Sequence, residues 1–94
     1  MKNNSQISII GFGYIGKVLS AFFLEKKLNI LAIEKNTKTI HNYETNRKIE
    51  IEEKDVQKIL SKNINKIILK KSNEEFKLSE IIFITVGTPL IGGK

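Results

Sequence analysis

Three glycines near the start of the chain, Gly11, Gly13 and Gly16, have the spacing G-x-G-x-x-G. An apolar run precedes them and an apolar pattern with helical spacing follows, which places them in a strand–turn–helix context. In such a turn the first glycine permits the sharp bend, the second lets backbone N–H groups approach a pyrophosphate, and the third lets helix and strand pack closely. The helix N-terminus adds free N–H donors and partial positive charge. These residues predict a site for the phosphates of a dinucleotide.

An acidic residue, Glu34, supplies the second part of the predicted site. It closes the apolar run 29–33, which we interpret as a second buried strand, and it lies about 20 positions beyond the glycines. There a carboxylate accepts hydrogen bonds from both hydroxyls of an adenosine ribose. It also repels the extra phosphate of NADP, so the predicted cofactor is NAD. Taken alone, Glu34 would be interpreted as a solvated acid after a strand.

The same glycines admit one alternative, because residues 11–17 also spell G-x-x-x-x-G-K, the opening of a P-loop. A P-loop needs a Ser or Thr hydroxyl for magnesium after the lysine, and this chain has Val18 there. A P-loop requires neither Gly13 nor an acid at the end of the second strand. The sequence therefore favours the dinucleotide site.

Composition limits the class of protein. The chain has 94 residues and 40% hydrophobic content, which suit one small globular domain or a piece of one. It has no cysteine, which excludes a disulfide framework and a thiolate metal site. The polar start and the lack of a long apolar run predict a cytoplasmic protein with no membrane partner. The net charge of +6 comes mostly from scattered lysines, with Arg47 the only arginine, so we expect no nucleic-acid partner.

Alternating strands and helices must position the candidate residues. The apolar periodicity predicts strands over 6–10, 29–33, 66–70 and 81–86, helices over 14–27, 37–44 and 52–62, a loop over 42–48, and a capped helical turn over 72–76. Asn36 is expected to cap the second helix, and His41 is expected at the surface. Strand, crossover helix and strand imply a right-handed parallel unit. The predicted fold is α/β, a partial Rossmann (doubly wound) fold with a parallel sheet of about four strands in order 3-2-1-4 and flanking helices.

Three stretches of the chain resemble the N-terminal NAD-binding domain of the UDP-glucose/GDP-mannose (nucleotide-sugar) dehydrogenase family. Residues 9–16, I-I-G-F-G-Y-I-G, are close to the family's V-I-G-L-G-Y-V-G. Residues 81–90, I-I-F-I-T-V-G-T-P-L, are close to its V-I-F-I-x-V-[GP]-T-P. More weakly, residues 51–56 fall where the family has a segment like I-Y-E-P-G-L. The resemblance spans essentially the whole chain but only the opening part of the family's architecture.

The resemblance implies an activity of which this chain carries one part. Members such as UDP-glucose 6-dehydrogenase oxidise the primary alcohol of a nucleotide sugar to a carboxylate with two NAD, for polysaccharide biosynthesis, using a cysteine nucleophile from a later segment. Since this chain has no cysteine, we expect residues 1–94 to be the N-terminal part of an NAD-binding Rossmann domain, with the catalytic and substrate domains absent. Such a fragment would bind NAD, would be inactive alone, and would meet the nucleotide sugar only in a full-length protein.

The resemblance also implies site residues, none of them catalytic or metal-binding. The implied cofactor contacts are Gly11, Phe12, Gly13, Tyr14, Ile15 and Gly16 at the pyrophosphate, Glu34 at the ribose, and Val86, Gly87 and Thr88 between adenosine and nicotinamide. Glu34 replaces a usual Asp. The family commonly has a basic residue five positions after that acid, and this chain has Thr39 there. Lys35 and Lys38 lie close by in the sequence, and Lys35 is included among the implied contacts. Lys54 and Asp55 replace Pro-Gly of the third stretch, so Glu53 is assigned no role.

Two other functions remain open from the sequence: a non-catalytic dinucleotide-sensing module, and an inert remnant. The dehydrogenase and the sensing module both need the glycines and Glu34, but only the dehydrogenase hypothesis explains residues 86–89. If strand 81–86 ends the sheet, its outer side is a long apolar edge without charge. We therefore expect a homo-oligomer, or aggregation, through that exposed edge.

Overall fold

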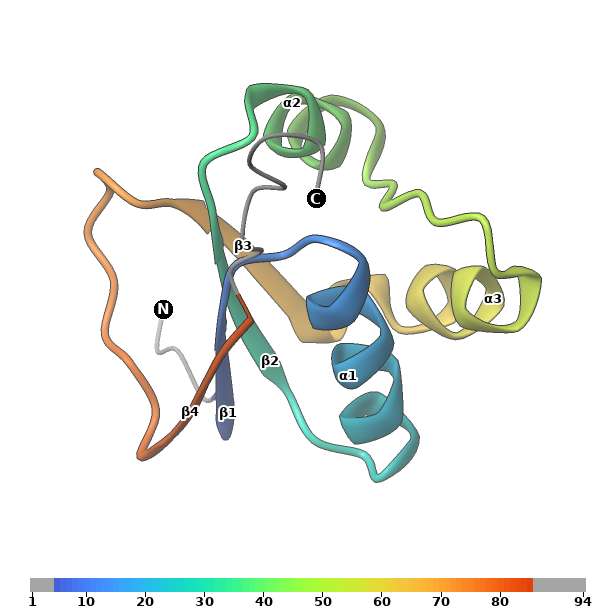
Figure 1. Ribbon diagram of the computed structural model, residues 1–94, viewed down its shortest axis with the longest axis horizontal. Coiled ribbons are helices and arrows are strands. Elements are labelled where there is room, and N and C mark those ends of the chain that lie inside the picture. The colour runs from blue at the N-terminus through green and yellow to red at the C-terminus, as the bar shows by residue number, and fades with distance from the viewer. Residues whose placement is uncertain (1–4, 86–94) are drawn as a thin grey trace, which may run out of the picture.

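Four parallel strands, three α-helices and one 3-10 turn make up the fold of residues 5–85. The computed structural model describes residues 5–85. Its elements are β1 (Ile7–Ile10), α1 (Tyr14–Glu25), β2 (Ile30–Glu34), α2 (Thr37–Asn46), α3 (Lys54–Lys62), the 3-10 turn η1 (Ile64–Lys66), β3 (Ile67–Lys71) and β4 (Ile81–Ile84). The sheet order is β3-β2-β1-β4 and each neighbouring pair is parallel (Figure 1). The predicted Rossmann-like fold and its strand order are confirmed.

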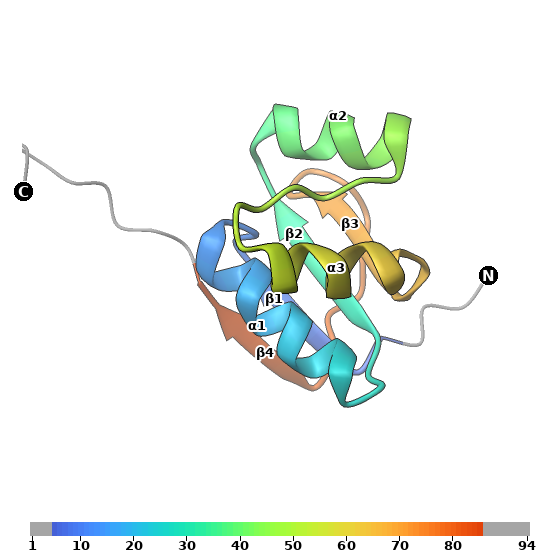
Figure 2. The same ribbon diagram turned by 90° about the vertical axis from the view of Figure 1, so that its right-hand side faces the viewer.

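The two faces of the sheet are covered differently. All three helices lie on one face, and the connection 72–80 crosses the other (Figures 1 and 2). Alternate residues of a strand serve opposite faces, so Ile9 packs toward Gly16 of α1 while its neighbour Ser8 bonds to the connection. Ser79 N–H donates to Ser8 Oγ at 2.8 Å, and Ser8 Oγ donates to Ser79 Oγ at 2.9 Å. These bonds fix the connection just before β4.

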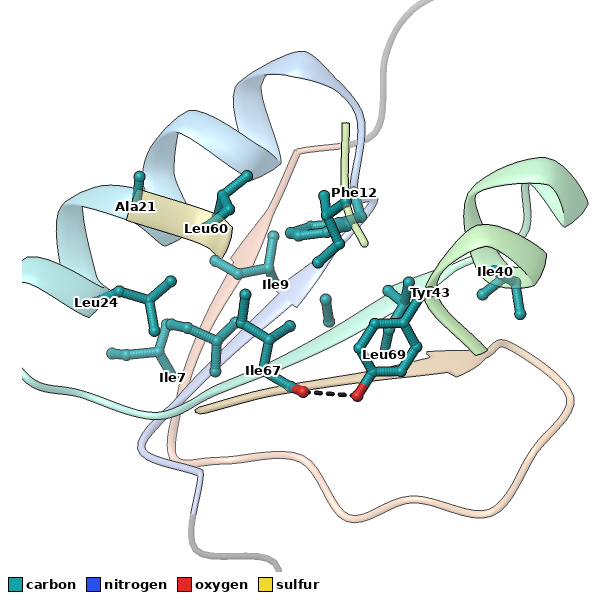
Figure 3. Packing of buried hydrophobic residues seen from close by; sticks show 13 residues of the cluster. Ile7, Ile9, Phe12, Ala21, Leu24, Ile40, Tyr43, Leu60, Ile67 and Leu69 are labelled. Atoms are coloured by element: carbon teal, nitrogen blue, oxygen red, sulfur yellow. Dashed lines mark hydrogen bonds between the residues drawn. The ribbon is translucent and has the colours of Figure 1, made fainter. Parts of the chain in front are cut away.

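The core lies between the sheet and the helices. Its buried cluster consists of Ile7, Ile9, Phe12, Ala21, Leu24, Ile30, Ala32, Ile40, Tyr43, Ile49, Leu60, Ile67 and Leu69 (Figure 3). Tyr43 enters this cluster without an unpaired hydroxyl, because its O–H donates to the buried Ile67 carbonyl at 2.7 Å. α3 turns Leu60 into the cluster and packs Val56 and Ile59 against it, as its periodicity predicts.

α1 is shorter than the predicted helix 14–27. It ends at Glu25, and Lys27 has a left-handed φ of 68°, a conformation that stops a helix. The buried residues of α1 are Gly16, Ser20, Ala21 and Leu24. Ile15 and Phe22 are 60% and 55% exposed. The apolar spacing therefore identified the helix correctly, with Leu19 and Phe23 packed against the core.

α2 begins where it was predicted and runs further. Asn36 Oδ1 accepts the N–H groups of Lys38 and Thr39 at 3.0 and 3.1 Å, which confirms the cap. The helix continues to Asn46, so most of the predicted loop 42–48 is helical; Arg47, with φ 51° and ψ 47°, ends it.

The predicted helical turn over residues 72–76 is wrong. After β3 the chain makes a non-helical turn in which Glu74 N–H donates to the Lys71 carbonyl at 3.1 Å. Glu74 Oε1 in turn accepts the Lys71 N–H at 2.8 Å. The acid that looked like part of a capped helix instead closes the end of a strand.

β4 lies at the edge of the sheet, with β1 as its neighbour. It ends at Ile84, and Val86, the end of the predicted strand, lies outside the described residues. Ile81, Ile82 and Ile84 are 52%, 42% and 70% exposed. An uninterrupted apolar strand is typical of a position covered on both faces, which is not the case here. Across residues 5–85, no helix is long and apolar enough to span a membrane.

Candidate dinucleotide-binding site

The glycine loop joins β1 to α1 at the carboxyl ends of the strands. Gly11 has a φ of 95°, a conformation that favours glycine. Its N–H donates to the Ile33 carbonyl of β2 at 2.8 Å, and its carbonyl accepts the Thr85 hydroxyl just after β4. The loop is therefore held from the strands on both sides of β1.

Gly16 allows α1 to approach the loop. A Cβ atom at Gly16 would lie 2.3 Å from the Gly11 carbonyl oxygen and 2.9 Å from Thr85 Oγ1, so no side chain fits. This is the close packing that the third glycine of the motif predicts.

Gly13 has the opposite surroundings, with no atom within 4 Å of a Cβ placed on it. It is the N-cap of α1, and the first bond of the helix runs from Lys17 N–H to the Gly13 carbonyl at 3.0 Å. The N–H groups of Tyr14, Ile15 and Gly16 precede that bond, so the helix itself offers them no acceptor. An anion can approach these donors over Gly13, where the helix dipole favours negative charge.

Glu34 is held in place by two backbone amides. Its Oε1 accepts the Phe12 N–H at 2.6 Å, and its Oε2 accepts the Asn36 N–H at 2.7 Å. An ionised carboxylate has about four acceptor positions, so each oxygen keeps capacity for a ribose hydroxyl. The carboxylate is thus fixed between the glycine loop and the start of α2.

Phe12 connects the glycine loop to both the core and Glu34. Its side chain is buried in the core and its N–H is bonded to Glu34. Phe12 therefore anchors the carboxylate, and its place at the pyrophosphate stays a prediction.

A pocket of about 480 Å³ contains these groups, within the usual range of roughly 300–1,000 Å³ for ligand sites. Of the predicted residues it brings together Gly11, Gly13, Tyr14, Ile15, Glu34 and Lys35. Gly16 lies behind the loop, and Val86, Gly87 and Thr88 lie outside the described residues. The lining also includes residues that sequence reasoning missed, namely Ile10, Ile33, Ser72 and Thr85. Ser72 directly follows β3, so the rule that ligands bind at the carboxyl ends of parallel strands was the available signal.

Two side chains link the start of α1 to the segment before α3. Lys17 Nζ donates to the Glu50 carbonyl at 2.8 Å, so this lysine turns away from the pocket. Burial lowers the pKa of Lys17, while the negative charges of Glu34 and Glu50 act in the opposite direction. Tyr14 O–H donates to Glu53 Oε2 at 3.4 Å. Glu53, to which no role was assigned, therefore contacts a residue of the pocket wall.

Comparison with known proteins gives one family match. The model of the UDP-glucose/GDP-mannose dehydrogenase family, NAD binding domain, matches residues 5–94. No curated protein and no solved structure matches the chain. The family match covers the glycine loop, Glu34 and the segment after β4 in one continuous region.

Proposed function

Because the chain belongs to the UDP-glucose/GDP-mannose dehydrogenase family and carries its NAD-binding domain, we propose that it holds NAD for the oxidation of a nucleotide sugar. The observation that carries this proposal is the position of Glu34. A carboxylate fixed by two backbone amides stands in the same pocket as the N-terminus of α1. The pocket therefore offers acceptors for a ribose diol and donors for a pyrophosphate.

Each part of the dinucleotide has a proposed place. The pyrophosphate lies over Gly13, against the N–H groups of Tyr14 and Ile15. The adenosine ribose donates its two hydroxyls to Glu34. Lys35 and Ser72 line the same pocket and lie at the adenosine end. Residues 86–88 complete the path toward the nicotinamide, as the family's motif implies.

Cofactor choice follows from the charge of Glu34. The carboxylate accepts from the diol of NAD and repels the phosphate that NADP carries there. Hydrogen bonds to charged groups contribute roughly 1.5–3 kcal/mol, so Glu34→Ala is expected to weaken NAD binding very roughly tenfold to a hundredfold.

Titration calorimetry with NAD and NADP on the wild type and the variant tests this assignment. Glu34 also anchors Phe12 and Asn36, so Glu34→Gln, which keeps the size and one acceptor oxygen, serves as the milder variant and should fall between the two. Thermal unfolding of each variant shows whether the fold is retained. Equal affinity of the wild type for NAD and NADP would contradict the assignment.

These residues supply cofactor binding and no covalent catalyst. The family's chemistry uses a cysteine nucleophile, and the printed sequence has none, so we propose that catalysis depends on residues outside these 94 positions. Incubation of the chain with NAD and UDP-glucose, UDP-N-acetylmannosamine or GDP-mannose should produce no NADH. Turnover above a buffer control would show that the proposal misplaces the chemistry.

A further inference from the structure

A second hollow, of about 430 Å³, lies between α1, α2 and the chain that leads to α3. It shares no lining residue with the pocket of Glu34. Its floor includes the buried side chain of Ile49, and Thr39 and Asn42 add a hydroxyl and an amide to its wall. The hollow is therefore separate from the dinucleotide pocket and is large enough for a small molecule.

Positive charge dominates the wall of this hollow. Lys17, Lys38 and Lys48 line it, and the carboxylate among the lining residues is that of Glu50. Lys48 Nζ and Glu50 Oε2 lie 3.8 Å apart with both side chains more than half exposed, so this pair is weak. Three ammonium groups around one concave surface focus a positive potential there.

Lys17 is the most buried of the three lysines, since Lys38 and Lys48 are both exposed. Its ammonium has three N–H donors, and its hydrogen bond within the described residues goes to a neutral acceptor, the Glu50 carbonyl. Burial lowers the pKa of Lys17 despite the opposing charges of Glu34 and Glu50. An anion in the hollow would favour the charged form of this half-buried lysine, as a nearby opposite charge does.

We propose that this hollow binds a small molecule through a phosphate or diphosphate group, independently of the dinucleotide. Lysine ammonium groups bind phosphate as point charges, and three of them match an anion that carries more than one negative charge. The volume of about 430 Å³ is that of a small-molecule site. Lys17 holds the anion from the α1 side, and Lys38 and Lys48 close on it from α2 and the following chain.

A titration of the NAD-saturated chain with inorganic pyrophosphate, followed by amide NMR shifts, tests the proposal. Pyrophosphate should move the amides of Thr39, Asn42 and Ile49 while those of the NAD-occupied glycine loop stay in place. Lys17→Met should weaken pyrophosphate binding roughly tenfold, since it removes a charged donor. Lys38→Met and Lys48→Met, both at exposed positions, should each weaken it several-fold and decide the question if Lys17→Met fails to fold. Lys58→Met, on the exposed side of α3, is the matched control and should leave binding unchanged.

Three results would overturn the proposal. Sodium chloride at the same ionic strength could give the same shifts, which would show general screening. Pyrophosphate could be displaced by NAD and move only the amides of residues 13–15, which would place it at the dinucleotide site. The three lysine variants could bind like the Lys58→Met control. NAD binding is measured separately by calorimetry. If the chain does not bind NAD but pyrophosphate still shifts the amides of Thr39 and Asn42, the proposed NAD-binding function is wrong and the phosphate site in the hollow is supported.

Discussion

Gly13 and Gly16 belong to one motif, but the backbone needs them for different reasons. A Cβ at Gly16 meets backbone at 2.3 Å, whereas one at Gly13 meets nothing within 4 Å. We expect Gly16→Ala to lower the free energy of unfolding by about 1–3 kcal/mol, as overpacking does. Gly13→Ala changes an N-cap and should cost less than about 1 kcal/mol, yet its methyl group should weaken NAD binding by standing in the path of the pyrophosphate.

Urea unfolding and calorimetry on the two variants separate these roles. A Gly16→Ala protein as stable as the wild type would contradict the packing argument. A Gly13→Ala protein with full NAD affinity would contradict the path proposed for the pyrophosphate.

Lys17 makes stability depend on pH. Its folded pKa is lowered from the model-peptide value of 10.5, chiefly by burial. Between the folded pKa and 10.5 the unfolded chain binds more protons at this residue, so the free energy of unfolding should rise with pH across that window. Lys17→Met removes this contribution. Urea unfolding of both proteins from neutral pH to 10.5, in buffer without phosphate, should therefore show the free energy of unfolding of the wild type rising relative to that of the variant. If the two free energies change with pH in parallel, Lys17 is not a buried ammonium.

At the residue scale, the residues proposed to bind the dinucleotide could be predicted from the sequence. The groups that position them were harder to predict. The types and spacing of Gly11, Gly13 and Glu34 are visible in the chain. The two donors that fix Glu34 are backbone N–H groups of Phe12 and Asn36, and every non-proline residue has such a group, so residue type carries no signal. Ser72 joins the pocket because β3 lies beside β2, which depends on topology.

At the scale of elements, a buried hydroxyl contributes to the packing of α2 on the sheet, beside the apolar contacts of Ile40 and the Tyr43 ring. Tyr43 O–H donates to the Ile67 carbonyl of β3 at 2.7 Å. Tyr43→Phe keeps the ring but leaves that buried carbonyl without this donor, so we expect a loss of about 1–3 kcal/mol. Tyr14→Phe is the matched control, since Tyr14 is exposed and its bond to Glu53 is 3.4 Å long. If both variants unfold at the same urea concentration, the Tyr43 hydrogen bond does not stabilise the packing of α2 on the sheet.

Element boundaries were predicted well where a local interaction sets them. Asn36 caps α2 through its own side chain, and this cap could be predicted from residue type. Residues 72–76 carry similar letters, but there Glu74 bonds back to the end of β3, and a strand end is a tertiary feature. On α1, Gly16 and Ser20 are buried while Ile15 and Phe22 are exposed, so residue type alone does not predict which positions of that helix are buried.

At the scale of the whole molecule, the sheet of the described residues has β3 at one edge and β4 at the other. The order β3-β2-β1-β4 places the glycine loop at the centre, flanked by the ends of β2 and β4. This arrangement followed from the parallel crossover rule, and it brings Glu34 to the loop without any further constraint. The rule does not predict which strands are covered by helices or loops. In the described residues, three of the four β4 side chains are exposed.

The outer side of β4 has the properties of a pairing edge. Thr85 N–H donates to the Ile10 carbonyl, and since successive residues of a strand alternate in direction, the N–H and C=O groups of Ile82 and Ile84 point away from β1. Both side chains are exposed, and Ile81–Ile84 contains neither charge nor proline, the usual protections of an edge. Phe23 and Phe83 stack at 5.3 Å, and the exposed Phe22 extends this apolar surface onto α1.

We therefore expect two chains to pair edge to edge through β4, in antiparallel orientation about a two-fold axis. A register with Phe83 opposite its own copy places Ile82 opposite Ile84, so the outward N–H and C=O groups of both strands are paired. The net charge of +6 opposes association, and added salt should strengthen association by screening that charge.

Light scattering on the wild type should show a dimer or larger species. Ile82→Lys or Ile84→Lys should weaken association roughly tenfold or more, because an ammonium replaces an apolar group worth about 1.5–3 kcal/mol on burial. Thr45→Lys adds the same charge to α2, at an exposed position on another element, and should leave association nearly unchanged. A wild type that stays monomeric at high protein concentration and high salt would mean that the exposed isoleucines of β4 do not pair with a second copy.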